Sequence, residues 1–354
     1  MVLKTKSIKE ALPELRQLIH DRHHGKWTSV QTRWKNLNRL TFDGLMWGWI
    51  VAIAGESGIG KTTFLDNIEE DILKTPDVSL LKFNFEMSSD NLLMKGLSRD
   101  TGKTVKDLYG FGINGVGYDK FNTLIDPFEK QMLTKDVYYA EQSGTPDDIY
   151  STAIDFIKTH QLRERSRKFV MSIDHAILVE MSKLVEGQKE LMNALKKIVQ
   201  FYKYSIILLV TQYNRDILST ERASTISSKL IHHYPMFSDI YGSESVRQGC
   251  DLAILFQSPS KRGITSYGPE KWDVYSKDNL PYLYAHLKKV RYSDPDTVIR
   301  FETKLSTNQL YEDDWIGYES SNREGGIFGI RDDMDLISNK QLINMGTEFN
   351  DLPF

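Results

Sequence analysis

A glycine-rich stretch early in the chain has the residue types and the spacing needed to hold a phosphate group. Gly55, four further residues and then Gly60, Lys61 and Thr62 satisfy the pattern G-x-x-x-x-G-K-[ST]. Glycines let the backbone turn so that successive N–H groups face the phosphates, and the helix that follows adds the positive end of its dipole. We therefore predict a nucleotide-binding loop made of Gly55, Glu56, Ser57, Gly58, Ile59, Gly60, Lys61, Thr62 and Thr63.

Two side chains of this loop have predicted roles. Lys61 is expected to pair with β- and γ-phosphate oxygens, and the Thr62 hydroxyl is expected to ligate Mg²⁺. The alternative is a glycine-rich turn that only connects two elements. The apolar run before the loop, residues 50–54, and the helical pattern after it, residues 62–73, give the strand-loop-helix context that favours phosphate binding.

Polar residues also close three later apolar runs. Glu86 follows one run and carries the carboxylate wanted in a base that orients an attacking water. Asp174 follows the second and suits the binding of Mg²⁺ through water. Gln212 closes the third, with an amide able to sense a γ-phosphate. Each alone is more often a helix cap or turn residue, but three of them at strand ends behind a phosphate-binding loop favour a nucleotide site.

The elements that must position these residues alternate between apolar, β-rich runs and helical patterns. We predict strands at residues 50–54, 80–85, 137–140, 168–173, 205–211, 252–257, 282–289 and 297–303. We predict helices between them at residues 62–73, 89–96, 146–159 and 186–201. Strands this apolar, separated by helices, indicate an α/β fold with a mostly parallel central sheet and helices on both faces.

The N-terminal segment has a shorter amphipathic pattern. Ser7 and Glu10 fit a capping box and apolar residues at helical spacing follow, so residues 8–22 suggest one amphipathic helix. Pro13 argues against that start and leaves open a helix that begins near Leu12. A short helix with one apolar face needs a surface to lie on, which is either its own domain or a neighbouring subunit.

Composition and charge limit the remaining classes. The chain has 354 residues, a net charge of −3 and one cysteine, Cys250, which excludes an intramolecular disulfide and a cysteine-based zinc cluster. No run of 18 apolar residues and no signal-peptide pattern is present, so we expect no membrane association and a cytoplasmic protein. Residues 311–354 carry −7, which leaves +4 on residues 1–310 and makes a polyanion such as DNA an acceptable partner.

Taken in chain order, these blocks resemble the C-terminal ATPase domain of hexameric replicative helicases of the DnaB type, in the RecA-like branch of P-loop ATPases. The likeness runs from about residue 32 to 311. It gives Glu86 the place of the catalytic base, Asp174 that of the Walker B aspartate and Gln212 a place in the third motif. Residues 286–302 resemble the hairpin in which a lysine and an arginine reach the neighbouring subunit's nucleotide, and those residues are Lys289 and Arg291 here.

The chain departs from the family pattern at several points. His175 follows Asp174 where the family usually has a tyrosine, and the glutamine of that block has no counterpart. His175 itself is interpreted as a packed or solvated side chain rather than a metal ligand. Arg247 stands where the family usually has an acid. The family's N-terminal collar domain has no counterpart, and the helix at residues 8–22 corresponds to the linker helix that docks on the next subunit.

The resemblance implies a RecA-like fold and a homo-oligomeric ring, a hexamer, that uses ATP and Mg²⁺ to translocate on single-stranded DNA and unwind duplex DNA. DNA contacts are expected from two loops, at residues 181–189 and 215–239, with Arg215, Arg222 and Lys229 as candidate phosphate ligands. Two alternatives stay open. One is a RecA-like recombinase, and the other is a DnaB-like ATPase that acts as a loader or scaffold without unwinding.

We therefore divide the chain into three parts: a linker helix and arm at residues 1–30, an ATPase domain at 31–312 and an acidic tail at 313–354. The tail ends in Pro353 and Phe354 and resembles the tail of bacterial single-stranded-DNA-binding proteins, in which a terminal phenylalanine docks on partners. It is expected to bind replication proteins in that way, or to act only as a solubilising or DNA-excluding acidic segment.

Overall fold

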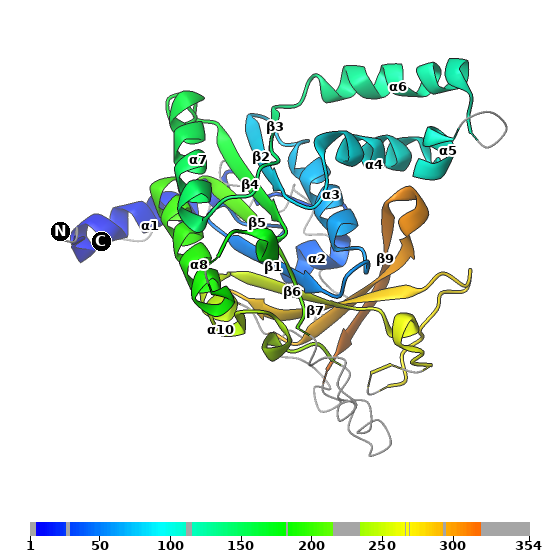
Figure 1. Cartoon of the computed structure of the whole chain (residues 1–354). Helices are drawn as coiled ribbons and strands as arrows, with labels where there is room; N and C mark the ends of the chain where they lie inside the picture. The colour runs from blue at the N-terminus through cyan, green and yellow to red at the C-terminus, as the bar shows by residue number, and fades with distance from the viewer. Residues whose placement is uncertain are drawn as a thin grey trace, which may run out of the picture. The chain divides into compact units, whose positions relative to one another are not determined.

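One nine-stranded sheet forms the centre of the computed structural model, which describes residues 5–25, 29–110, 115–181, 183–214, 234–265, 267–268, 270–292 and 295–319 (Figure 1). The strand order is β3-β2-β4-β5-β1-β6-β7-β8-β9. Neighbours from β3 to β6 pair in parallel, and the pairings from β6 to β9 are antiparallel. The predicted α/β class with a mostly parallel sheet is confirmed.

The strands follow the predicted apolar runs closely. Their bounds are β1 (Ile50–Gly55), β2 (Val78–Asn84), β3 (Val137–Ala140), β4 (Lys168–Asp174), β5 (Ser205–Gln212), β6 (Leu252–Gln257), β7 (Tyr282–Val290), β8 (Thr297–Lys304) and β9 (Gln309–Tyr318). The helices are α1 (Ile8–His23), α2 (Lys35–Leu40), α3 (Lys61–Ile72), α4 (Ser89–Thr101), α5 (Val105–Tyr109), α6 (Tyr118–Met132), α7 (Pro146–Thr159), α8 (Leu184–Phe201) and α10 (Ser243–Gly249), with a short 3₁₀ turn η6 (Pro259–Arg262) after β6.

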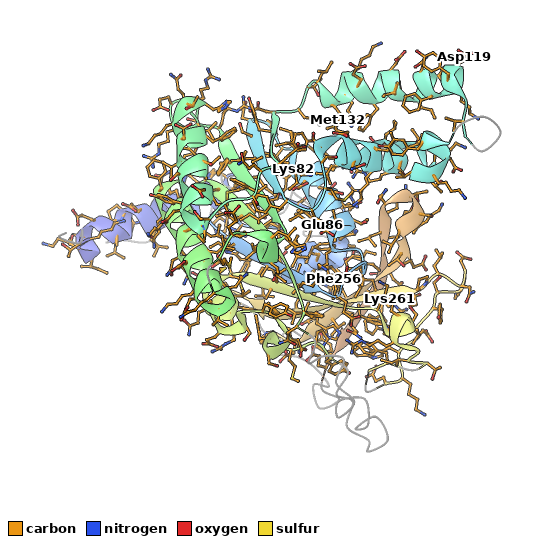
Figure 2. The ribbon with its side chains drawn as sticks, in the orientation of Figure 1. Lys82, Glu86, Asp119, Met132, Phe256 and Lys261 are labelled. Carbon is orange, nitrogen blue, oxygen red and sulfur yellow. The ribbon has the colours of Figure 1, made fainter. Side chains whose placement is uncertain are left out.

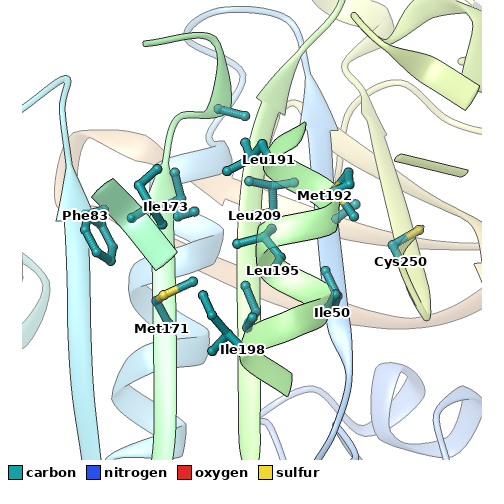
Figure 3. Close-up of a cluster of buried hydrophobic side chains, with 14 of the residues drawn as sticks. Ile50, Phe83, Met171, Ile173, Leu191, Met192, Leu195, Ile198, Leu209 and Cys250 are labelled. Atoms are coloured by element: carbon teal, nitrogen blue, oxygen red, sulfur yellow. The ribbon is translucent and has the colours of Figure 1, made fainter. Parts of the chain in front are cut away.

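The central strands are apolar throughout because both faces of the sheet are covered. Ile50 and Ala52 of β1 belong to a core shared with α7, α8 and α10, whereas Val51 and Ile53 belong to a second core shared with α2 and α3. Successive strand residues point to opposite faces, so an unbroken apolar run is what two cores require. Figure 3 shows the first core, where Leu195 and other residues of α8 pack on the sheet.

Several elements differ from the expectation. The helices α2, α5, α6 and α10 were not predicted. Of these, α6 is the longest; it contains Pro127 and none of its residues is fully buried. The strand β9 runs across the expected boundary between residues 312 and 313, so the folded unit continues to Glu319. The acidic residues there are used by the fold: Glu312 accepts hydrogen bonds from the backbone N–H groups of Asn36 and Leu37, at 2.8 and 3.1 Å.

The N-terminal helix begins at Ile8, with the capping box between Ser7 and Glu10 formed and Pro13 inside the helix. The alternative start near Leu12 is therefore wrong. No residue of α1 is buried, and its apolar side chains are 42% to 70% exposed. Within the described part of the chain, no helix is long and apolar enough to cross a membrane.

A buried lysine on β2 forms ion pairs with two carboxylates of α3. Lys82 is 7% exposed, and its Nζ lies 2.6 Å from Glu69 Oε2 and 3.3 Å from Asp66 Oδ1. Burial opposes the charge on Lys82, but the two carboxylates outweigh it and raise the pKa of the lysine. Figure 2 shows Lys82 on β2.

Removing this cation is expected to destabilise the fold. The substitution Lys82→Met should lower the free energy of unfolding by about 3 kcal/mol, because the buried Glu69 loses its counter-ion and Asp66 keeps only Lys95. Urea unfolding of the full chain measures this change. The double variant Lys82→Met/Glu69→Gln should recover part of the loss, and an equal loss in the single and double variants would show that the charges are not coupled.

Candidate active site

The predicted phosphate-binding loop connects β1 to α3. Its turns depend on glycine: Gly58 has φ 65° and Gly60 has φ 107°, a backbone region that residues with a Cβ rarely adopt. Gly60 also precedes the first residue of α3, so the N-terminus of that helix faces the loop. The loop borders a cavity of about 370 Å³, lined by Ser57, Gly58, Gly60, Lys61, Thr62, Thr63, Glu86, Lys95, His175, Gln212 and Leu305.

Lys61 is folded back onto the loop. Its Nζ donates hydrogen bonds to the carbonyl oxygens of Gly55 and Glu56, at 2.9 and 2.8 Å. Burial lowers the pKa of Lys61 to about 8, although Asp174 and Glu86 act in the opposite direction. A buried ammonium held by neutral carbonyl oxygens is well placed to exchange them for the anionic oxygens of a phosphate.

Thr62 and Asp174 are in direct contact. The Thr62 hydroxyl donates to Asp174 Oδ2 at 2.8 Å, and burial raises the pKa of the Asp174 carboxyl, against the effect of that hydrogen bond. Oxygen ligands of these two kinds suit Mg²⁺, and a cation here would relieve the cost of the buried carboxylate. The described residues contain no cluster of three or more His, Cys, Asp or Glu side chains that could hold a metal ion.

Glu86 lies at the rim of the same cavity. Its side chain is 52% exposed, so water reaches the carboxylate. The backbone N–H of Phe85 donates to the Asp174 carbonyl at 3.0 Å, which brings the ends of β2 and β4 together. His175 Nε2 lies 3.6 Å from Glu86 Oε2, and burial lowers the pKa of His175, so this imidazole is neutral at physiological pH.

Gln212 completes the group from β5, the strand between β4 and β1. It ends β5, and its Cα is paired with that of Gly55 across the parallel β1–β5 ladder. The structure therefore brings Glu86, Asp174 and Gln212 to the phosphate-binding loop, because the carboxyl ends of parallel strands lie at one edge of a sheet.

Two further residues line the cavity that the sequence reasoning did not select. Lys95 lies on α4 and forms an ion pair with Asp66 Oδ2 at 3.4 Å. Lys95 lies in the helix predicted at residues 89–96, which follows Glu86, and this position could have marked it as a candidate site residue. Leu305 follows β8 and approaches Gly60, where an added Cβ would meet it at 3.1 Å. No local pattern marks Leu305, since only the packing of β8 and β9 places it there.

Lys289 and Arg291 lie at the opposite edge of the sheet. Lys289 pairs with Ala253 near the start of β6, and the Arg291 backbone N–H donates to the Asp251 carbonyl at 2.8 Å, just before β6 begins. The Asp251 N–H in turn donates to the carbonyl of Ile50, the first residue of β1. The loop begins five residues further along β1, roughly 17 Å away. Neither cation is near the loop of its own subunit.

Asp251 holds the arginine at that edge. Its side chain forms an ion pair with Arg291 and accepts a hydrogen bond from the Ile50 N–H at 2.8 Å. The Asp251 side chain is only 11% exposed, whereas that of Arg291 is 45% exposed. A guanidinium has five N–H donors and one carboxylate engages at most two, so Arg291 keeps donors for another anion.

The candidate DNA ligands Arg215, Arg222 and Lys229 lie outside the described residues. The other candidate loop, residues 181–189, is largely helical: α8 already begins at Leu184. The prediction of a loop at residues 181–189 is therefore wrong from Leu184 onward. Only a short segment separates α8 from the 3₁₀ turn after β4, Ala176–Leu178.

We next compare the chain with known proteins, now that the loop, the residues that end the strands and the strand order have been described. The model of the family described as the DnaB-like helicase C-terminal domain matches residues 29–278. The chain belongs to this family. The matched region includes the loop and every strand-end residue discussed above, and it stops just before β7, which carries Lys289.

Curated relatives of the chain are replicative helicases. It is 27% identical over 241 residues to the replicative DNA helicase DnaB of Buchnera aphidicola subsp. Baizongia pistaciae, covering 65% of this chain and 46% of that protein. It is 21% identical over 265 residues to replicative DNA helicase DnaB of Geobacillus stearothermophilus, covering 74% and 51%. The DnaB-like chain thus spans about half the length of the curated relatives it matches.

Solved structures share the fold of this chain. One of them, described as an ATPase domain, gives a TM-score of 0.66 at 17% identity, covering 87% of this chain and 99% of that one. A DnaB-like replicative helicase, solved in a study of its interactions with primase, gives a TM-score of 0.65 at 16% identity, covering 87% and 67%. The RecA-like ATPase fold is therefore confirmed.

Proposed function

We propose that this DnaB-like chain is the motor of a ring-forming replicative DNA helicase, which hydrolyses Mg·ATP, moves along single-stranded DNA and separates duplex DNA. Family membership supports the reaction class. The observation that carries the proposal is the separation of the catalytic groups: the loop lies at one edge of the sheet, and Lys289 and Arg291 lie at the other. A ring of subunits joined head to tail brings these two edges together.

Within one subunit, the loop and the strand-end residues share the work. In this proposal Lys61 leaves the loop carbonyls to pair with phosphate oxygens, and Thr62 and Asp174 hold Mg²⁺, which neutralises phosphate charge when bound. Glu86 orients the attacking water and accepts its proton, since its carboxylate is open to solvent. Gln212, at the end of β5, responds to the γ-phosphate.

The neighbouring subunit completes the site. Lys289 and Arg291 from that neighbour place positive charge beside the γ-phosphate, where negative charge develops during its transfer. Asp251 keeps the arginine at the exposed edge. An isolated subunit is therefore expected to be nearly inactive, because its own cations lie at the wrong edge of its sheet.

The expected partners follow from this proposal. The ring is a homo-oligomer of six subunits that encloses single-stranded DNA, with Arg215, Arg222 and Lys229 as proposed phosphate contacts. The acidic tail beyond β9, residues 320–354, lies outside the described residues and remains a proposed contact to replication proteins. The recombinase and the non-unwinding loader are not favoured, since the curated relatives above are named replicative helicases.

A strand-separation assay tests the proposed function. The full chain should separate a forked duplex with ATP and not with a non-hydrolysable analogue, and electron microscopy should show closed rings. Filaments would instead support a recombinase. Rings that hydrolyse ATP without separating strands would support a loader or scaffold.

Deleting residues 1–25 is expected to weaken the ring and leave the ATPase domain folded. The apolar face of α1 is exposed, with Leu12 55% and Leu15 51% accessible, and a free helix this short is only marginally stable. We therefore expect the helix to lie in a groove of a neighbouring subunit. Light scattering of the deleted chain should show a lower oligomeric mass at equal concentration.

Point variants separate this role from a general effect of the N-terminus. Leu12→Glu on the apolar face should reproduce the loss of ring mass, whereas Arg16→Glu, at an exposed polar position of the same helix, should not. If the oligomeric mass is unchanged after the deletion, the helix does not lie on a neighbouring subunit and instead belongs to its own domain.

A further inference from the structure

Two cations on the turn after β6 hold the phosphate-binding loop. The Lys261 Nζ donates to the carbonyl oxygen of Gly58 at 2.6 Å and to that of Ser57 at 3.2 Å. The next residue, Arg262, donates from Nε to Glu56 Oε1 at 2.8 Å. Both cations come from η6, and Figure 2 shows Lys261 on that turn. No sequence motif considered above gives either residue a role.

Lysine side chains occupy four successive carbonyl groups of the loop. Lys61 takes the carbonyls of Gly55 and Glu56, and Lys261 takes the next two. Lys61 lines the cavity, and Lys261 does not.

The two lysines differ in what a nucleotide does to them. An ammonium binds a charged phosphate oxygen more strongly than a neutral carbonyl, so Lys61 is expected to leave Gly55 and Glu56 when a nucleotide arrives. Lys261 does not line the cavity and is expected to keep its contacts. Without Lys261, no lysine would hold the carbonyl groups of the loop after Lys61 has moved to the phosphate.

The pair between Arg262 and Glu56 is shielded from solvent. The Arg262 side chain is 13% exposed and that of Glu56 is 21% exposed. Buried ion pairs are screened by salt much less than exposed ones, and a bond through the planar guanidinium also fixes direction. The contact with Lys261 is close as well, because a Cβ added at Gly58 would lie 3.3 Å from its Nζ.

We propose that Lys261 and Arg262 form a brace, meaning a pair of positioning residues that keep the loop in its nucleotide-binding form before the nucleotide arrives and while Lys61 changes partners. The inference rests on the proposed function only in treating this loop as the nucleotide site. A loop that is already ordered loses less conformational entropy on binding. The brace therefore acts on nucleotide affinity and not on the chemical step.

Reversing the partly buried pair of Arg262 and Glu56 tests the brace. In the full chain, Arg262→Glu and Glu56→Arg should each weaken the binding of Mg·ATP, measured by calorimetry, by about tenfold. The double variant that exchanges the two charges should return to within about threefold of the parent. In Arg262→Glu the rate at saturating ATP should stay close to that of the parent, while KM follows the affinity.

Matched charge changes elsewhere provide the control. Arg165→Glu and Glu164→Arg alter exposed residues just before β4, at the edge of the sheet away from the loop, and should leave affinity unchanged. Lys261→Met removes the two carbonyl contacts and should weaken binding without rescue by any change at Glu56. Parent-like affinity in the single variants, or no recovery in the exchanged variant, would overturn the brace.

Hydrogen exchange of the loop amides gives a second measurement that needs no nucleotide. Exchange across residues 55–60 should be faster in Arg262→Glu than in the parent, and the exchanged variant should restore the slow rate. Equal exchange in all variants would also overturn the brace. A parent that binds no ATP but shows this exchange pattern would contradict the proposed function and leave the brace standing.

Discussion

Replacing Glu86 with glutamine is expected to lower ATP hydrolysis by about 10² to 10⁴ while leaving ATP binding close to that of the parent. The carboxylate is half exposed at the rim of the cavity, close to the Thr62–Asp174 pair and open to water. Glutamine keeps the size and the hydrogen-bonding shape of the side chain but accepts no proton from an attacking water. Single-turnover hydrolysis and calorimetric ATP binding, measured on the same preparation, separate the two effects.

The loop variant Lys61→Ala should fail in a different way. Lys61 is expected to pair with phosphate oxygens in the bound state, so its removal should weaken binding itself. As a control, Glu129→Gln changes an exposed carboxylate on α6, away from the cavity, and should hydrolyse ATP like the parent. If Glu86→Gln hydrolyses ATP within a few-fold of the parent, the base is another group, and the nearby His175 becomes the next residue to replace.

Replacing Arg291 with alanine is expected to lower the ATPase rate of the ring by about 10³, because charge on the γ-phosphate loses its partner from the next subunit. The structure gives the reason for expecting an effect in trans: Arg291 is held by Asp251 at the edge of the sheet opposite its own loop. The binding of ATP should change much less than the rate, since the contact matters most when charge develops.

Mixing two inactive variants tests that arrangement directly. In rings formed from equal amounts of Arg291→Ala and Lys61→Ala, about a quarter of the interfaces have an intact loop facing an intact arginine, so activity should return to about a quarter of the parent rate. Arg165→Ala removes an exposed arginine just before β4 that has no part in the proposed interface, so it should have parent-like activity and should give no gain of this kind. Mixtures no more active than the mean of their components would mean that Arg291 acts within its own subunit or not at all.

Much of the central sheet was predictable because its strands are buried on both faces. Burial on two sides demands an unbroken apolar run, and such runs are visible without knowledge of the fold. The same runs predict which residues meet: Glu86, Asp174 and Gln212 each end a parallel strand, and the carboxyl ends of parallel strands share one edge. The glycine positions of the loop are equally local, since Gly58 and Gly60 adopt backbone angles that only glycine adopts readily.

Elements with little burial were less predictable. The strand β9 lies at a sheet edge and carries three consecutive acids, Glu312, Asp313 and Asp314. These acids resemble those of a tail until Glu312 is seen to bind the N-terminus of α2. The helix α6 has an amphipathic pattern, but it contains Pro127 and none of its residues is fully buried. The sequence left two possible starts for α1, one set by the capping box at Ser7 and a later one suggested by Pro13. The capping box is formed in the structure, so the helix begins at Ile8.

By itself, the sequence determined the α/β class, the phosphate-binding loop and the residues that end the strands, because each of these depends on short-range patterns of burial and backbone freedom. Only the tertiary structure decided how distant segments meet. It brought Lys261 and Arg262 of η6 onto the loop and Leu305 into the cavity. It also placed Arg291 at the far edge of the sheet, since β7 pairs antiparallel to β6 and ends where β6 begins. Strand order and direction set these contacts, and neither is contained in the local pattern of any one strand.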